Sequence, residues 1–160
     1  MAVLISINKP HTDNIFSDVK CVEWRTKPLP DGLYYVYETK NKGGCGMVIG
    51  EMHIVGSQAI NTGGDLEVWL VNAGCVHPVT LKKYANNGTV YANFIKDAKL
   101  YDKPKLLSEF VRDKALSHND WLFGVYSGGK GAKGNYDSYL NVFRLKRPPQ
   151  SWCYVKELSL

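Results

Sequence analysis

A lysine, a glutamate and an arginine fall within six positions of an otherwise strand-like run, IFSDVKCVEWRTKP at 15–28. Arg25 offers a planar pair of donors and Lys20 a mobile point charge, so both suit a phosphate group or the edge of a nucleobase. The carboxylate of Glu23 can accept from an exocyclic amine, as carboxylates do from cytosine, or it can hold the arginine in place. Together with Lys9, these side chains predict a charged ligand-binding cleft.

The strand period decides where these charges point. Side chains alternate between the two faces of a strand, so Lys20, Val22 and Trp24 share one face, and Glu23 and Arg25 lie on the other. If Val22 and Trp24 enter the core, Glu23 and Arg25 emerge side by side on the opposite surface. The alternative interpretation is a surface ion pair without a ligand, which contributes only about 0 to 1 kcal/mol.

Aromatic side chains offer surfaces on which a base can stack. The chain has ten tyrosines and four tryptophans, and stacking contributes about 1 to 3 kcal/mol per base. Most aromatic residues on strands belong to the core, and this is the expectation for Trp24. The candidates for stacking are nevertheless Trp24, Tyr35, Tyr37 and Tyr91, and Tyr91 is taken as a ligand-binding residue. The hydroxyl of Thr26, directly after the charged run, is another candidate.

Positive charge gathers toward the C-terminal end. The net charge is +5, and residues 127–147 hold five basic residues against a single acid, Asp137. The stretch SGGKGAKGN lacks the GK[ST] ending of a phosphate-binding loop, so we expect a flexible basic loop that contacts a nucleic-acid backbone. A solvated face balanced by charges elsewhere is the alternative. The candidates for backbone contact are Lys130, Lys133, Arg144, Lys146 and Arg147.

Metal and redox chemistry find little support in the sequence. The four histidines lie far apart and the four cysteines include no CxxC pair, so no zinc-ribbon or thioredoxin-type motif is present. We expect no metal and no cofactor. Apolar runs fall short of the roughly 18 residues that a membrane helix needs, and residues 1–11 carry no signal-peptide pattern. A soluble, cytoplasmic protein without membrane contact is expected.

The elements that must position these residues are mostly strands. Apolar, β-branched and aromatic runs predict strands, whereas proline at a first helical position and an apolar stripe predict short helices. The predicted strands are 2–7, 20–25, 33–40, 46–56 with a bulge at Gly50, 89–101, 121–126, 139–147 and 151–158. The predicted helices are 10–17, 77–84 and 103–111.

Strands outnumber helices, most connections are short, and strand and helix do not alternate regularly. This pattern favours an α+β domain built on a compact β-barrel over a doubly wound sheet. At 160 residues the chain has the size of one domain. We therefore expect a single domain over 1–160, with insertions at 57–76 and 112–138.

Several of these segments together resemble the ASCH family, small PUA-like barrels related to RNA-modification domains. The resemblance implies an α+β fold: a mixed β-barrel of about six to seven strands decorated by short helices. It also implies a role in RNA or nucleotide chemistry. The matching segments are SINKP (6–10), IFS (15–17), KCVEWR (20–25), GE (50–51), FIKDAKLYDKPKLLSEF (94–110) and RPPQSW (147–152). The last two of these are similar to one bacterial and phage group of ASCH-containing proteins.

One branch of the family hydrolyses the amide of acetylated cytidine with a lysine, a threonine and a glutamate. By resemblance, Lys20 matches that lysine and Glu51 lies near that glutamate, but Glu23 stands at the threonine position. A carboxylate there changes the attack on an amide carbonyl, because it would form an anhydride. Thr26 lies close enough in sequence to supply the hydroxyl. The catalytic candidates are Lys20, Glu23 and Glu51.

Three functions remain open on these grounds. The first is a binding module for RNA or a modified nucleoside or nucleotide, with the charged cleft lying between the first helix and the barrel. The second is a hydrolase of a modified nucleoside, or a ribonuclease, on the same cleft. The third is a phage or mobile-element interaction protein whose basic face binds a protein partner.

Overall fold

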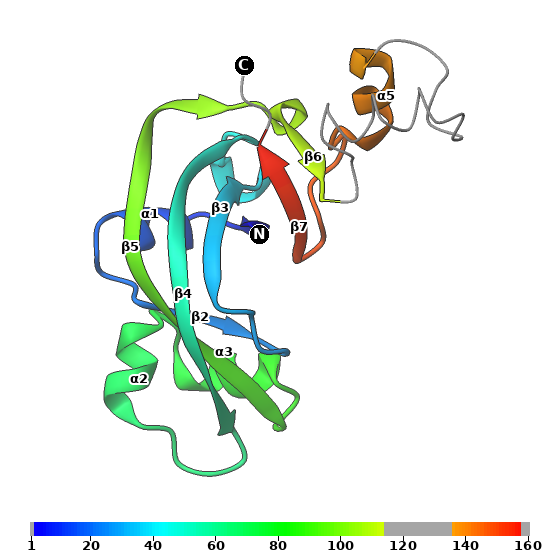
Figure 1. Ribbon diagram of the computed structural model, residues 1–160. Helices are drawn as coiled ribbons and strands as arrows, with labels where there is room; N and C mark the ends of the chain where they lie inside the picture. Colours follow the sequence, from blue (N-terminus) through cyan, green and yellow to red (C-terminus); the bar gives the residue numbers. More distant parts are fainter. Residues whose placement is uncertain (1, 114–135, 158–160) are drawn as a thin grey trace.

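The computed structural model describes residues 2–113 and 136–157, which form one curved sheet with short helices around it (Figure 1). The strands are β1 Ala2–Ile7, β2 Val22–Arg25, β3 Gly32–Glu38, β4 Val48–Asn61, β5 Thr89–Lys105, β6 Phe110–Arg112 and β7 Trp152–Glu157. The helices are α1 His11–Phe16, α2 Val68–Ala73, α3 Pro78–Tyr84 and α5 Tyr136–Phe143, with 3-10 turns η1 Asn41–Gly43 and η2 Leu107–Glu109. Within these described ranges, no helix is long and apolar enough to cross a membrane.

All seven strands belong to one mixed sheet in the order β2-β5-β4-β3-β1-β7-β6. Strands β1 and β3 run parallel, and the other neighbours run antiparallel. Over the described residues the strands curve as the wall of a barrel does, but the sheet stays open with β2 and β6 at its edges (Figure 1). The predicted α+β fold, with its mixed strands and few short helices, is confirmed.

The first strand is buried on both faces, which explains why all its residues except Ser6 are apolar. Val3 and Ile5 point into a core that α1 covers, whereas Leu4 points into a second core with Phe110 and Val155. Successive side chains of a strand alternate between faces, so a strand between two cores is apolar on both faces. The sequence AVLISI therefore occupies an interior position in the sheet.

The helix predicted at 103–111 is wrong. Strand β5 continues through Lys105, and Phe110 opens β6 opposite β7. Phe110 is fully buried, and its ring lies 4.9 Å from that of Tyr35. The apolar residues are spaced as in a helix, but their burial in the sheet decides the structure. Only the short 3-10 turn η2 remains of the predicted helix.

The strand predicted at 139–147 is also wrong, because α5 occupies its first half. Tyr136, Leu140 and Phe143 recur at helical spacing and pack on Val111 of β6. In a helix these three side chains lie on one face, so the exposed residues between them face away from β6. The strand predicted at 121–126 and most of the insertion predicted at 112–138 lie outside the described residues.

Helices α2 and α3 pack on β2 at the end of the sheet that lies away from α5 (Figure 1). Leu70 of α2 and Leu81 of α3 are buried with Val22 and Trp24 of β2. The range 57–76, predicted as an insertion, contains the last residues of β4 and all of α2. These helices enclose the start of β2, where the charged run begins.

Candidate functional site

The connection between α1 and β2 turns Lys20 toward Glu23. The carbonyl of Asn14 accepts hydrogen bonds from the amides of Val19 at 2.9 Å and Lys20 at 2.8 Å. Lys20 therefore precedes the strand, and the alternation that was expected to place it away from Glu23 does not apply. Its Nζ lies 3.4 Å from Glu23 Oε2 and donates to the carbonyl of Gly74 at 2.7 Å.

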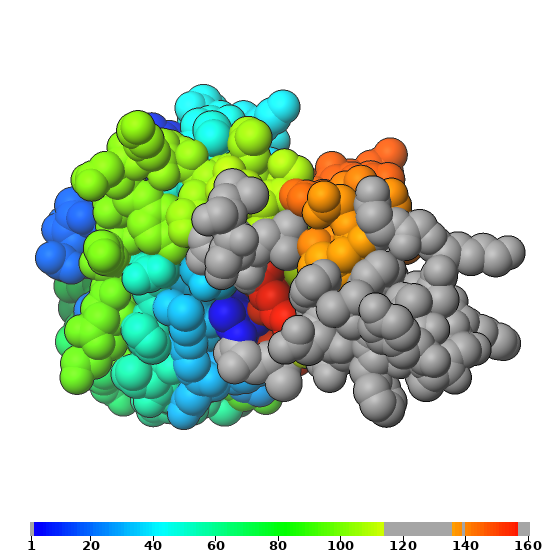
Figure 2. Space-filling view, turned by 45° about the horizontal axis from the view of Figure 1, so that its top comes forward, coloured from blue at the N-terminus to red at the C-terminus, as the bar shows by residue number. Residues whose placement is uncertain are grey.

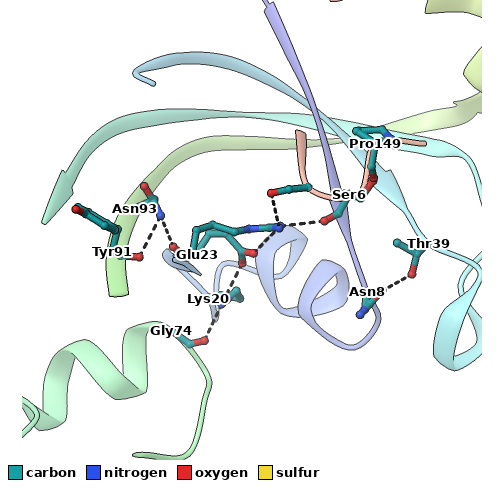
Figure 3. A network of polar contacts seen from close by, with 11 residues as sticks. Ser6, Asn8, Lys20, Glu23, Thr39, Gly74, Tyr91, Asn93 and Pro149 are labelled. Carbon is teal, nitrogen blue, oxygen red and sulfur yellow. Dashed lines mark hydrogen bonds and ion pairs between the residues drawn. The ribbon is translucent and has the colours of Figure 1, made fainter. Parts of the chain in front are cut away.

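Glu23 joins two cations, as Figure 3 shows for its contact with Lys20. Its other oxygen, Oε1, lies 3.0 Å from Arg25 Nη2. The Glu23–Arg25 ion pair of the alternative interpretation is present, but it is mostly buried, with side chains 10% and 15% exposed. Lys20 is only 2% exposed. Buried charges lose several kcal/mol of hydration each, and pairing offsets this loss. We call Lys20, Glu23 and Arg25 the charged cluster.

Arg25 connects the cluster to two other parts of the chain. Its Nη2 donates to the carbonyl of Ser6 in β1 at 2.9 Å, and its Nη1 donates to Ser151 Oγ at 3.2 Å. The hydroxyl of Ser6 in turn donates to the carbonyl of Pro149 at 2.8 Å (Figure 3). Arg25 is thus held by Glu23, β1 and the segment before β7, and it positions Glu23.

A pocket of about 170 Å³ opens beside the cluster, between α1, β2 and α3. We call it the Lys20 pocket. Typical small-molecule pockets measure roughly 300 to 1,000 Å³, so this one admits a single ring system. Its apolar walls are Trp24, Val76, Leu81 and Tyr84. Its polar lining is His11, Lys20, Glu23 and Thr80.

His11 lines this pocket, and its surroundings shift its pKa. Burial lowers the pKa of His11 below its ordinary value of 6.5, and the charge of Lys20 lowers it further, while Glu23 acts in the opposite direction. The ring is therefore neutral at pH 7. Its Nδ1 is buried without a hydrogen-bond partner among the described residues, which is rare for a buried polar atom.

Asn93 of β5 holds the backbone behind the cluster. This residue is fully buried. Its Nδ2 donates to the carbonyls of Glu23 at 2.9 Å and Tyr91 at 3.1 Å, as Figure 3 shows. Its Oδ1 accepts from the amide of Leu29 at 2.8 Å and from Ser57 Oγ at 2.5 Å. A buried amide with all these bonds fixes the position of β2 against β5.

The polar and aromatic pocket residues His11, Thr80 and Tyr84, and the supporting residue Asn93, were absent from the predicted site. Asn93 left one signal, a polar residue inside an otherwise apolar strand, where a buried polar side chain needs partners. His11 follows the SINKP segment directly. Thr80 and Tyr84 sit one turn apart on α3, and no spacing in the sequence connects that helix with the charged run.

The other predicted ligand-binding and catalytic residues lie elsewhere. Lys9 pairs with Asp13 at 3.5 Å on the surface, and Thr26 is exposed. Tyr91 is half-buried opposite Arg25 in the β2–β5 register. Glu51 accepts a hydrogen bond from Tyr101 at 2.7 Å. The described residues that line the Lys20 pocket include none of Lys9, Thr26, Glu51 and Tyr91.

The predicted backbone contacts fall into two groups. Arg144 and Lys146 line a second and larger cleft beside α5, and Arg147 is exposed next to it. Lys130 and Lys133 lie outside the described residues. Across the ranges that the structure describes, no three His, Cys, Asp or Glu side chains converge as a metal site.

The curved mixed sheet with short helices around it defines an α+β domain. Among solved structures, the ASCH protein from Zymomonas mobilis matches with a TM-score of 0.60 and 18% sequence identity, over 97% of this chain and 87% of that chain. Two variants of that protein match with TM-scores of 0.59 and 0.58 at 17% and 16% identity, over 97% of this chain and 88% and 90% of theirs. No protein-family model and no curated protein matches the sequence. The chain thus has the ASCH fold that its motifs imply.

Proposed function

We propose that the chain binds an unpaired nucleobase of RNA, or a modified nucleoside or nucleotide, in the Lys20 pocket. The observation that carries this proposal is the buried charged cluster, of which Lys20 and Glu23 border a pocket of the size of one ring system while Arg25 pairs with Glu23. An apolar pocket with a few polar groups on one side is the usual form of a small-molecule site.

The cluster has an excess of positive charge that favours an electron-rich ligand atom. Arg25 and Lys20 share the single carboxylate of Glu23. A lysine ammonium has three N–H donors, and Glu23 and the Gly74 carbonyl account for two of them. The remaining donor of Lys20 suits a carbonyl oxygen of a base, because a buried charge is stabilised by each hydrogen bond it makes.

The rest of the pocket complements the same ligand. Neutral His11 offers an unpartnered Nδ1, and nucleobases carry donors and acceptors along one edge. Trp24 and Tyr84 supply aromatic surface on the apolar side; a stacked base gains about 1 to 3 kcal/mol. Since the pocket holds one ring system, the sugar and phosphate of the ligand stay outside it.

Hydrolysis of a modified nucleoside is the second candidate, and one observation favours it. The hydroxyl of Thr80 lines the same pocket as Lys20, so a nucleophile and a cationic group border one ligand. Thr26 and Glu51, which the resemblance suggested for this chemistry, do not line the pocket among the described residues. Incubation with acetylated cytidine, followed by chromatography, separates the candidates, because a binding module shows no turnover and an enzyme loses turnover in Thr80→Val.

Calorimetric titration with cytidine, acetylated cytidine, uridine and adenosine tests the binding proposal. We expect at least one of these nucleosides to bind, and its affinity to fall about tenfold in Tyr84→Ala and in Glu23→Gln, as loss of one stacking contact or one charged hydrogen bond predicts. Glu51→Gln is the matched control for the carboxylate and should bind as the wild type does. Tyr84 is 49% exposed, so its replacement leaves the fold intact. Unchanged affinity in both pocket variants overturns the proposal.

A further inference from the structure

A second hollow is a cleft of about 910 Å³, and it shares no lining residue with the Lys20 pocket. Three segments form it: the end of β3 with η1, the η2 turn, and the end of α5 with the residues that follow it. In Figure 2 the cyan of residues near 40 and the orange of α5 both adjoin the yellow-green of residues near 107. We call this hollow the Arg144 cleft.

The charges of the Arg144 cleft all have one sign. Lys40, Arg144 and Lys146 line it, and no carboxylate is found among its described lining residues. The hydroxyl of Ser108 and the amide of Asn41 add neutral hydrogen-bonding groups. A concave surface that carries only cations raises the local concentration of anions and holds them by hydrogen bonds.

Arg144 has donors to spare in this cleft. Its Nη1 donates to the carbonyl of Ser108 at 2.6 Å, which orients the guanidinium against η2. Its Nε is buried and has no hydrogen-bond partner among the described residues. A guanidinium has five N–H donors and binds phosphate oxygens in pairs. An oriented arginine with an unpartnered buried nitrogen therefore suits a phosphate group.

We propose that the Arg144 cleft binds the phosphodiester backbone of a single-stranded RNA whose unpaired base enters the Lys20 pocket. This inference rests on the proposed function, because a base held in a pocket of one ring system leaves its backbone outside. The ligand is then a strand, and a free nucleoside occupies only half of the site. Single-stranded sites commonly combine a positively charged groove with stacking of bases in this way.

One short segment connects the two sites. Ser151 accepts a hydrogen bond from Arg25 of the charged cluster, and Pro149 accepts one from Ser6. Pro148, immediately before Pro149, lines the Arg144 cleft together with Lys146. Three residues span at most about 11 Å, so Ser151 at the cluster and Pro148 at the cleft lie within the reach of a few nucleotides. This segment therefore contacts the charged cluster at one end and the Arg144 cleft at the other.

Fluorescence anisotropy with a labelled single-stranded RNA of about 12 nucleotides, within the roughly 4 to 16 of known single-stranded sites, tests the inference. We expect Lys40→Gln, Lys146→Gln and Arg144→Gln each to weaken RNA binding several-fold and to reduce the salt slope by about 0.7. Binding of whichever of the four nucleosides binds the wild type should not change in these variants. Lys96→Gln, an exposed lysine of β5, is the control. Lys40 and Lys146 are exposed, so their replacement leaves the fold intact even if Arg144→Gln does not.

The outcomes separate this inference from the proposed function. The inference is overturned if RNA affinity and salt slope in the three cleft variants equal those of Lys96→Gln, or if poly-glutamate or duplex RNA competes as well as the single strand. The proposed function fails on its own if the cleft variants lose RNA binding while Tyr84→Ala and Glu23→Gln retain both RNA and nucleoside binding. Loss of RNA binding in both groups, with nucleoside binding lost only in the pocket variants, supports both.

Discussion

The ammonium of Lys20 donates to the carbonyl of Gly74 at 2.7 Å and thereby joins the start of β2 to the end of α2. Gly74 follows the last residue of α2, where carbonyls lack partners within the helix and carry partial negative charge. Because Lys20 also lines the Lys20 pocket, its replacement should affect stability and the proposed ligand binding together.

Replacing Lys20 with methionine should destabilise the fold by about 3 to 5 kcal/mol, because Glu23 then keeps a buried charge with one partner fewer. Urea unfolding followed by circular dichroism measures this loss. A double-mutant cycle with Glu23→Gln should give a coupling of about 0.5 to 3 kcal/mol. Lys96→Met changes an exposed lysine and serves as the control. Additive losses would show that the two side chains do not interact.

Replacing Gly74 with alanine should narrow the Lys20 pocket and destabilise the protein. A Cβ at this position would lie 2.7 Å from Trp24 Cδ1, closer than real contacts allow, so the indole must shift. Overpacking of this kind costs about 1 to 3 kcal/mol, and the shifted indole should also weaken nucleoside binding. Thermal unfolding and tryptophan fluorescence report the two effects.

Gly64→Ala is the matched control for this prediction, because a Cβ there meets no atom within 4 Å. Its melting temperature should remain at the wild-type value. A Gly74→Ala protein with wild-type stability and wild-type fluorescence would contradict the packing of Trp24 described above.

The strands could be predicted from the sequence where a run of β-branched and aromatic residues is buried in the sheet. AVLISI and LYYVYETK contain the β-branched and aromatic residues that suit a pleated, buried surface, and they lie in β1 and β3. The errors at 103–111 and 139–147 have a common cause. Both segments are short and their apolar residues fit two periods, so the choice between strand and helix depends on contacts with β7 and β6 that sequence spacing does not show.

The charged cluster was predictable only in part, for a similar reason. Glu23 and Arg25 are two positions apart on one strand, and the period of two brings them together. Gly74 and Asn93 come from segments more than fifty residues away along the chain, so no local pattern relates them to Lys20 or Glu23. The same applies to Thr80 and Tyr84, which reach the pocket because α3 packs on β2.

Acidification should weaken the fold through His11. Burial and the charge of Lys20 hold the pKa of His11 below 6.5 in the folded state, so the unfolded chain binds a proton at a higher pH than the folded one. The stability that His11 contributes is therefore complete above pH 6.5 and is lost as the pH falls from 6.5 through the folded pKa. Urea unfolding at several pH values measures the slope.

His11→Gln should reduce this pH dependence, whereas His53→Gln, which changes an exposed histidine, should retain it. The groups that act on His11 are Lys20, Glu23, Lys42 and Arg25, and all keep their charges in both variants. An unchanged slope in His11→Gln would mean that other groups cause the loss of stability.

Asn93 should tolerate no substitution that removes its donors. In Asn93→Asp the side chain can still accept from Leu29 and Ser57, but the carbonyls of Glu23 and Tyr91 lose their donor inside a fully buried region. Each unpaired buried polar group costs about 1 to 3 kcal/mol, and the new charge adds to this loss. Asn72→Asp makes the same exchange at an exposed position and should leave the unfolding midpoint unchanged. Because Asn93 fixes β2 behind the cluster, Asn93→Asp should also lose nucleoside affinity. A variant that keeps both the wild-type unfolding midpoint and the wild-type nucleoside affinity would contradict the role assigned to the buried amide.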